Sequence, residues 1–460
     1  MRFIGIDLGT TFIKGAVLDL DNWSIRHVER SPFPEPIPGL RTSFREFDPA
    51  QIVTATRALL ERLLRHAPDA EGIVCCSQLH GLVFSTDDGL AVSNFISWQD
   101  QRALEASPSG GSTYFDEVNR RLTPEERRDL GNEPRPGVPL CFLHWLAQNG
   151  NLPAQPALAA DLPGFVVANL CGCAPTTDVT RAAAHGALNV QTSTWHQPVI
   201  KKFELNRVRW PEIVAQGAVV GRFRFGQRDI PVYAPVGDYH CSQGGALLQE
   251  GELSVNISTG SAVIQLARGY EAGDFQTRPW FDGRYLKTIT HIPGGRALNA
   301  LIRLLTELAE SQGLPLKDPW DYIQAEAAKI HTTDLRVDPA FYFSAMGDHG
   351  SVQGMREENL TVGHLFHAAF AGMADNYARC AARIAPSRDW TRLVFSGGVA
   401  LKSALLRRFI CDRLGSSHRL TASEEDTMLG LLLLALAFRG RCRSVAEAIA
   451  RGREHFQVAA

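Results

Sequence analysis

Two carboxylates in this 460-residue chain are well placed to do chemistry, and Asp7 is the first of them. It ends the apolar run 3–6 and precedes a turn made of Gly9, Thr10 and Thr11. A carboxylate at the end of an apolar strand is costly unless it is used. Backbone N–H and hydroxyl groups in such a turn suit phosphate oxygens, and the carboxylate suits a cation. The pattern indicates a site for a metal-bound polyphosphate, although an ordinary hairpin with polar turn residues would also produce it.

Asp238 is the second carboxylate. It follows the predicted strand 232–236 and Gly237, where a carboxylate at the mouth of a cleft can reach a primary alcohol. Phosphoryl transfer to a hydroxyl needs positioned phosphates, neutralised charge and a group that accepts the hydroxyl proton. Asp238 is the candidate for this last role, and its alternative role is that of N-cap for a helix from 241 onward.

Two later turns also combine hydroxyl groups with glycine. One joins the predicted strands 252–257 and 262–267, and the other follows the buried strand 393–395. These turns contain Ser258, Thr259, Gly260 and Ser261, and then Ser396, Gly397 and Gly398. The turn at 258–261 repeats the design of the opening hairpin, so each half of the chain carries one such hairpin.

A third group of polar side chains follows two predicted strands, 72–76 and 94–97. Its members are Gln78, His80, Trp98, Asp100 and Arg102. A polyol needs paired donors and acceptors together with an apolar wall, and this group supplies both. The alternatives are that His80 and Trp98 belong to the core and that Arg102 pairs with Asp100 or another carboxylate on the surface.

The elements that must position these residues alternate between strands and helices, which predicts an α/β fold. Asp48 and Pro49 predict the start of a helix, and further helices are expected at 139–148, 164–170, 241–248, 294–310, 362–384, 402–414 and 424–438. The polar segment 107–137 is expected to be an insertion over the core. The repeated hairpin predicts two related domains that face one cleft, at 1–245 and 246–460.

Composition and charge narrow the function classes. The formal net charge of −2 gives no reason to expect nucleic acid or an anionic membrane as a partner. The nine cysteines are odd in number and form no CxxC pair, which favours buried thiols in a reducing cytoplasm. The first apolar run is too short for a signal peptide, and the run 428–438 is too short to span a bilayer. We therefore expect a cytoplasmic protein, and the sequence leaves open whether it forms a homodimer.

Taken in order, these segments resemble the FGGY carbohydrate kinases of the actin-like ATPase superfamily. The resemblance extends over most of the chain and rests on its segments GIDLGTT (5–11), SQLHG (77–81), WQDQR (98–102), VGD (236–238), NISTGS (256–261) and SGG (396–398). Each segment alone is a weak signal, but their order and spacing together are a strong one.

The resemblance implies two ribonuclease-H-like domains with ATP and a sugar in the cleft between them. Asp238 matches the catalytic base, and Asp7 matches the residue near the metal, so Mg²⁺ is expected close to both. Residues 9–11, with Lys14 nearby, match the first phosphate loop. Residues 258–261 match the second phosphate loop, and residues 396–398 match the adenosine side.

The resemblance also implies the reaction, which is ATP-dependent phosphorylation of a primary hydroxyl of a ketose. The segments look most like those of kinases that act on sedoheptulose, with xylulose or another pentulose or polyol as the alternative. Many members carry an E-R-x-P segment where this chain has residues 343–350, which puts pentose specificity in doubt. Glycerol is less favoured, because Gln78-Leu79-His80 replaces the Gln-Arg-Glu of glycerol kinases.

Other phosphate-binding designs are not supported by the sequence. The chain has no GxxxxGK[ST], no GxGxxG after a strand and no protein-kinase signature set. The alternative of another class is a non-kinase actin-like ATPase or a sugar-responsive regulator. Either would bind ATP without phosphorylating a sugar.

Overall fold

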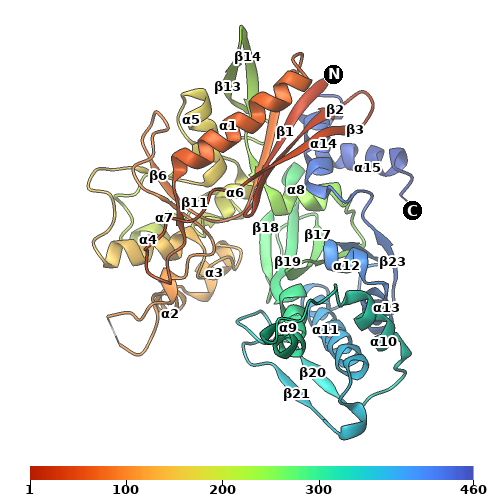
Figure 1. Ribbon diagram of the computed structural model, residues 1–460. Coiled ribbons are helices and arrows are strands. Elements are labelled where there is room, and N and C mark those ends of the chain that lie inside the picture. The colour runs from red at the N-terminus through yellow and green to blue at the C-terminus, as the bar shows by residue number, and fades with distance from the viewer. Residues whose placement is uncertain (109, 459–460) are drawn as a thin grey trace.

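The computed structural model describes residues 1–108 and 110–458 and has two mixed β-sheets flanked by helices (Figure 1). This confirms the predicted α/β class. The first sheet contains β1 (Arg2–Leu8), β2 (Phe12–Asp19), β3 (Ser24–Pro32), β5 (Ile73–Ser77), β13 (Val219–Phe225), β14 (Arg228–Tyr233) and β15 (Val236–Gly237). The second contains β16 (Glu252–Ile257), β17 (Gly260–Ala267), β18 (Gln276–Pro279), β19 (Tyr285–Pro293), β22 (Arg392–Ser396) and β23 (Ser417–Leu420).

The two sheets share one topology. In the first, β1 pairs antiparallel with β2 and parallel with β5, and β3 lies beyond β2. In the second, β16 pairs antiparallel with β17 and parallel with β22, and β19 lies beyond β17. The hairpin repeated in the sequence is therefore the centre of each sheet.

The register of the first sheet brings the two carboxylates to one edge. Asp7 on β1 and Val236 on β15 both lie opposite Cys76 of β5, and both pairings are parallel. Parallel strands end at the same edge of a sheet. Asp7 and Asp238 therefore emerge on the two sides of the end of β5.

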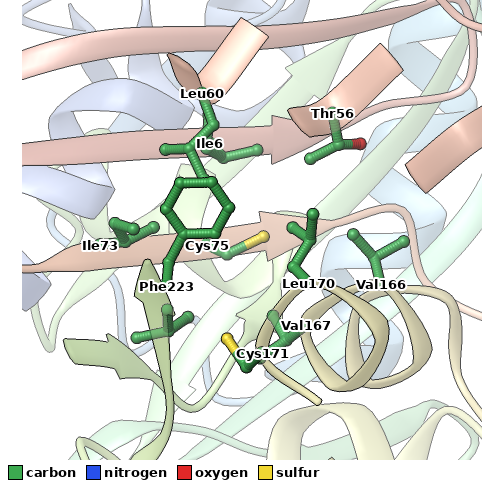
Figure 2. A pocket seen from close by; sticks show the side chains of 11 residues that line it. Ile6, Thr56, Leu60, Ile73, Cys75, Val166, Val167, Leu170, Cys171 and Phe223 are labelled. Carbon is green, nitrogen blue, oxygen red and sulfur yellow. The ribbon is translucent and has the colours of Figure 1, made fainter. Parts of the chain in front are cut away.

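Helices cover both faces of the first sheet. One face carries α1 (Pro49–His66) and α5 (Leu162–Cys171), and the Asp48 side chain caps α1 at the N–H of Ala50, as predicted. A cavity of about 20 Å³ lies beneath these helices, among Ile6, Thr56 and Phe223 (Figure 2). Its lining is almost wholly apolar and the Thr56 hydroxyl already donates to a backbone carbonyl, so a water would lack partners there. It is a packing gap in the core rather than a ligand site.

The opposite face carries α8 (Asp238–Gly245), α14 (Asp426–Phe438) and α15 (Val445–His455), so the end of the chain returns to strands β1–β3 (Figure 1). Helices α8 and α14 cross at two glycines. A Cβ on Gly245 would lie 1.8 Å from the carbonyl oxygen of Asp426, and one on Gly430 would lie 2.0 Å from that of Cys241. This close approach explains the small residues of α8 and holds the N-terminus of α14 beside the edge that carries Asp7.

The second sheet contacts α9 (Gly295–Ser311), α11 (Val362–Ile384) and α12 (Gly398–Lys402), and α10 (Trp320–Lys329) and α13 (Ala404–Leu414) pack on α11. The remaining elements belong to the region between β5 and β13 or are short. They are α2 (Tyr114–Arg121), α3 (Pro124–Asp129), α4 (Pro139–Gln148), α6 (Val179–Ala183), α7 (Gln197–Lys202), β4 (Glu46–Phe47), β6 (Val83–Ser85), β7 (Phe95–Ile96), β8 (Leu158–Ala160), β9 (Thr176–Thr177), β10 (Leu188–Asn189), β11 (Thr194–Trp195), β12 (Glu212–Ile213), β20 (Arg336–Asp338) and β21 (Ser351–Gln353).

Three details differ from the predicted elements. The helix expected at 241–248 begins three residues earlier, at Asp238. The helix expected at 402–414 is divided at Ser403, whose hydroxyl caps α13. The segment 107–137 contains α2 and α3, each with a capping box, because Thr-x-x-Asp and Thr-x-x-Glu sequences satisfy the first N–H groups of a helix. None of the described helices is long and apolar enough to cross a membrane.

Candidate active site

Asp7 is a partly buried carboxylate in which one oxygen accepts a hydrogen bond and the other has no donor. Its Oδ2 accepts a hydrogen bond from Thr427 Oγ1 at 3.2 Å. Its Oδ1 is buried, and no described residue donates to it. Burial raises the pKa of Asp7, and the charge of Lys14 opposes that rise. A buried carboxylate oxygen without a donor is a place where a cation would be stabilised.

Asp238 is the first residue of α8, where the helix leaves the end of β15. Its Oδ1 accepts a hydrogen bond from the N–H of Tyr239 at 2.6 Å, and Gly237 rather than Asp238 holds the N-cap position. Burial and then the charge of Asp7 raise the pKa of Asp238 to about 7, against the opposing charges of Arg181 and Arg278. A carboxyl with this pKa is matched to accepting a proton at neutral pH.

The two carboxylates fit a divalent cation that brings further ligands with it. In residues 1–108 and 110–458 there is no group of three or more His, Cys, Asp or Glu side chains that could hold a metal ion. Mg²⁺ is usually held by one or two carboxylates, substrate phosphates and water. Asp7, with its free oxygen, and Asp238, on the other side of β5, would supply the carboxylate ligands of such an ion.

The first turn joins the residues predicted for phosphate to those predicted for sugar. Thr10 Oγ1 accepts a hydrogen bond from Trp98 Nε1 at 3.1 Å and donates one to Gln78 Oε1 at 3.2 Å. Gln78 Nε2 reaches the carbonyl oxygen of Gly9 at 3.4 Å. Gln78 is buried, whereas Trp98 is 37% exposed and Thr11 is exposed. The structure therefore brings Gly9, Thr10, Gln78 and Trp98 together at one edge.

Lys14 lies on β2 near the same edge, and its Nζ contacts Glu425 at 2.5 Å. Glu425 and the next two residues are at the start of α14, and sequence reasoning did not include them in the site. Burial raises the pKa of Asp426 to about 6, with the charge of Lys14 opposing it, and Thr427 binds Asp7. The acidic residues before a leucine-rich helix were a visible signal, but only the packing of α14 on the first sheet brings them to Asp7.

His80 adopts a left-handed backbone conformation, with φ of +64°, and its ring faces two acceptors. Nδ1 lies 2.8 Å from the carbonyl oxygen of Ala184, and Nε2 lies 3.3 Å from the carboxylate of Glu133. Burial and the charge of Arg278 lower the pKa of His80 to about 4, despite Glu133. A neutral ring with its proton on Nδ1 leaves Nε2 as an acceptor beside a carboxylate, which suits a hydroxyl donor such as that of a sugar.

Glu133 and Arg278 are buried polar residues that sequence reasoning missed. Arg278 Nη2 and Nε donate to the two oxygens of Glu133 at 2.7 and 3.0 Å. Glu133 follows α3, and Arg278 lies on β18 of the second sheet, so this pair joins two regions of the molecule. No local pattern predicts it, because its members are 145 residues apart in the chain.

Asp100 and Arg102 pair with each other and make no hydrogen bond to the other predicted site residues of the described chain. Arg102 Nε and Nη2 both donate to Asp100 at 2.8 Å, and Nη2 also contacts Glu46 at 2.5 Å. The pair is buried, and the guanidinium lies 4.3 Å from the ring centre of Phe44 and 5.3 Å from that of Trp145. This geometry gives the two residues a structural task, which is to hold the segment that carries Trp98.

The turn between β16 and β17 leaves three of its four predicted residues accessible. Ser258 N–H donates to the carbonyl oxygen of Gly260 at 2.9 Å, and the start of α9 donates to the carbonyls of Ser258 and Thr259. Ser261 is buried, and its Oγ accepts a hydrogen bond from the Tyr377 hydroxyl at 2.9 Å. Ser258, Thr259 and Gly260 are thus the accessible part of the turn.

The turn after β22 lies against the turn that holds Ser258. Ser396 Oγ accepts a hydrogen bond from Asn256 Nδ2 at 2.8 Å. Gly397 has φ of +85°, and a Cβ there would lie 2.6 Å from Ser258 Oγ, so only glycine fits. The turn at 396–398 therefore packs against the second hairpin, with Ser396 buried, and α12 begins there at Gly398.

A model of the N-terminal domain of the FGGY family of carbohydrate kinases matches residues 2–240. The chain belongs to this family. It is 25% identical over 459 residues to the sedoheptulokinase of Mus musculus, across 88% of this chain and 91% of that protein. Membership confirms the predicted class of enzyme, an ATP-dependent sugar kinase.

Solved structures confirm the predicted fold. A ligand-bound xylulose kinase from Lactobacillus acidophilus superposes with a TM-score of 0.82, at 20% identity, over 99% of this chain and 96% of that one. The glycerol kinase of Plasmodium falciparum, solved with ADP, superposes with a TM-score of 0.83, at 19% identity, over 98% and 92% of the two chains. The FGGY kinase therefore has the two-domain, actin-like ATPase fold.

Proposed function

We propose that this FGGY kinase transfers the γ-phosphoryl group of ATP to a primary hydroxyl of a ketose, with sedoheptulose as the first candidate and D-xylulose as the second. The observation that carries the proposal is Asp238, a carboxyl with its pKa raised to about 7 at the strand-end edge that also holds Asp7. The likeness to a sedoheptulokinase over most of both chains supports the first candidate.

In this proposal Asp238 is the general base. When ionised, its carboxylate accepts the proton of the primary hydroxyl as that oxygen attacks the γ-phosphorus. The N–H bond from Tyr239 fixes the direction of the carboxylate. Bound Mg²⁺ would neutralise the charge on the phosphates, and Asp7 and Asp238 are the residues that would hold it.

The remaining predicted residues divide into two sets. The nucleotide contacts are Gly9, Thr10, Thr11, Lys14, Ser258, Thr259, Gly260, Gly397 and Gly398, with the buried Ser261 and Ser396 as supports. The sugar contacts are Gln78, His80 and Trp98, joined by Glu133. Asp100 and Arg102 stabilise the segment of Trp98.

The predicted domains 1–245 and 246–460 would close on the sugar, with α14 of the second part packed on the first sheet and α15 packed on α14. Closure excludes water. Without closure, Asp238 would activate water to hydrolyse ATP without phosphorylating the sugar. The pairing of Glu133 with Arg278 across the two regions supports a sugar site at their junction. Free thiols at all nine cysteines, each a described residue, support a cytoplasmic location, and a homodimer remains a prediction that size-exclusion chromatography would test.

The test is a coupled assay of ADP release with sedoheptulose, D-xylulose, D-ribulose and glycerol. We expect sugar-dependent ADP release, with the highest kcat/KM for sedoheptulose and little for glycerol. A higher kcat/KM for D-xylulose than for sedoheptulose would transfer the assignment to the pentulose. No sugar-dependent release with any of the four would refute the ketose assignment.

A further inference from the structure

The short helix α6 brings two side chains to the strand ends that carry the proposed site. It lies between β9 and β10 in the chain and contacts β15 and β18 (Figure 1). Asp178 caps it by accepting a hydrogen bond from the N–H of Arg181 at 3.0 Å. Asp178, Thr180 and Arg181 are each at most 1% exposed, so this turn is fully buried. None of the three is among the proposed catalytic or binding residues.

The strand that leads to the base is short. β15 is only two residues long and pairs with the end of β5. Pro235 precedes it and has no N–H to donate. Gly237 and Ser77 form the last pair of this ladder. The next residues along the two strands are the base Asp238 and the sugar contact Gln78, so the position of both depends on how this last pair is held.

Thr180 binds the end of β15. Its Oγ1 accepts a hydrogen bond from the N–H of Gly237 at 3.0 Å and donates one to Asp178 Oδ1 at 2.7 Å. Because the single hydroxyl proton points to Asp178, only lone pairs face Gly237, and the carboxylate fixes the direction of the hydroxyl. Gly237 is also the N-cap of α8, whose first residue is Asp238. The hydroxyl of Thr180 therefore fixes the backbone one residue before the base.

Arg181 binds the end of β5. Its Nη1 donates to the carbonyl oxygens of Ser77 at 3.0 Å and Gln78 at 2.5 Å. Its Nε lies 3.5 Å from Asp161 Oδ2, so the buried charge has a partner. Asp161 is fixed in turn, because its Oδ1 accepts a hydrogen bond from the N–H of Gly164 at 2.7 Å and caps α5. The same helical turn that holds β15 thus also holds the neighbouring strand.

We propose that Thr180 and Arg181 are positioning residues that hold the ends of β15 and β5 at a fixed separation, so that Asp238 meets the hydroxyl of a sugar bound at Gln78. This rests on the proposed function, in which Asp238 is the base. Adjacent residues of α6 bond to the two members of the last ladder pair, so neither strand end can move alone without breaking a buried hydrogen bond. A misplacement of about 1 Å can cost about 100-fold in rate. Thr180 acts on the base side, and Arg181 acts on the sugar side.

The first experiment removes the hydroxyl and keeps the shape of the side chain. Thr180→Val should lower kcat with sedoheptulose about 10- to 100-fold and change KM for the sugar less than threefold, because the base moves while the sugar contacts stay. Thr180→Ser keeps the hydroxyl and should recover kcat to within about threefold of wild type. The coupled ADP assay measures both at a temperature at which circular dichroism shows each variant folded. Thr180→Ala removes the same hydroxyl and takes the place of Thr180→Val if the latter does not fold.

Thr56→Val is the matched control. Thr56 is another buried threonine beside the first sheet, and its hydroxyl donates to the carbonyl oxygen of Ile52 at 2.8 Å within α1. It removes a buried hydroxyl from the same sheet's covering helices and leaves the strand ends untouched. Its kcat should stay within about twofold of wild type.

A second variant tests the sugar side. Arg181→Lys keeps a positive charge near Asp161, but an ammonium lacks the fixed planar geometry with which the guanidinium reaches two carbonyl oxygens. It should raise KM for the sugar about three- to tenfold and lower kcat less than Thr180→Val does. The two variants therefore divide kcat from KM in opposite directions.

The outcomes separate this inference from the proposed function. A folded Thr180→Val with kcat within twofold of wild type, a Thr180→Ser no more active than Thr180→Val, or an equal loss in Thr56→Val would overturn the inference and leave the proposed function in place. An unchanged KM in Arg181→Lys would overturn the sugar-side half. If wild type prefers D-xylulose, the same changes measured with D-xylulose support the inference. No ADP release by wild type with any sugar would refute both.

Discussion

The central hairpins of the two sheets carry different side chains at one equivalent position. Asp7 is the second-last residue of β1, and Asn256 is the second-last residue of β16. Asp7 keeps one buried oxygen without a described donor and has a raised pKa. Asn256 instead donates its amide to Ser396 at 2.8 Å and links the two turns of its own sheet.

In the proposed reaction, the two copies of the fold have different tasks. Both hairpins present glycine and hydroxyl groups at their tips, which suits phosphate in either half. The carboxylate of Asp7 raises the pKa of Asp238 and would meet a cation, whereas Asn256 adds no charge at the equivalent place. The proposal therefore duplicates the phosphate-binding groups and assigns the charged chemistry to the first sheet.

The largest expected effect comes from removing the base. Asp238→Asn should lower kcat by about 10²–10⁴ because the amide cannot accept the hydroxyl proton, while ATP affinity changes little. Coupled ADP release measures the first quantity and nucleotide titration the second. Asp229→Asn, an exposed carboxylate on β14 of the same sheet, is the control and should retain full activity. Near-full turnover in Asp238→Asn would remove Asp238 from this role.

Exchanging the equivalent side chains should give the next largest effect. Asp7→Asn makes the first hairpin resemble the second and should lower kcat about 100-fold and raise the Mg²⁺ concentration needed for half-maximal activity. Asn256→Asp should mainly weaken ATP binding, by about tenfold, because it adds negative charge beside the phosphate turn. Mg²⁺ titrations at saturating ATP distinguish the two. An unchanged Mg²⁺ requirement in Asp7→Asn would place the cation elsewhere.

The pH dependence should follow the raised pKa of Asp238. The base acts only when ionised, so kcat/KM should fall about tenfold per pH unit below a midpoint near 7. The folded state holds this proton more tightly than the unfolded chain, so its contribution to stability is fully present below the ordinary pKa of 3.8 and is lost as pH rises from there to about 7. Asp238→Asn should therefore melt about 1–3 °C higher than wild type at pH 8, and the difference should narrow as pH falls towards 4. A flat rate profile from pH 5.5 to 8 would contradict this.

The smallest effect concerns the second hairpin alone. Tyr377→Phe removes the hydroxyl that binds Ser261 and should lower the free energy of unfolding by about 1 kcal/mol. Its kcat should change less than twofold, because Ser261 is buried and supports the turn without facing the nucleotide. Denaturant titration and the ADP assay check the two statements. A loss of ATP affinity above tenfold would instead give Ser261 a direct contact.

Local patterns predicted the parts of the site that are continuous in the chain. The hairpin at Asp7 and the two later turns lie close to where the sequence placed them, although β17 already begins at Gly260. The predicted strand 232–236 is interrupted, because β14 ends at Tyr233 and β15 begins at Val236. The start of α8 was misplaced because Gly237 and Asp238 resemble a cap, while the chain enters the helix directly from β15. In the pair Asp100 and Arg102, adjacency predicted the contact but not its burial, which Phe44 and Trp145 decide from distant positions.

The sequence alone determined the α/β class, the duplicated hairpin and the kinase family, because strand periodicity, turn residues and motif order are local properties of the chain. The tertiary structure decided which charges meet. It set Asp238 beside Asp7 across β5, brought Thr427 to Asp7 and joined Glu133 to Arg278. These contacts join segments that are far apart in the chain, so no local pattern predicts them.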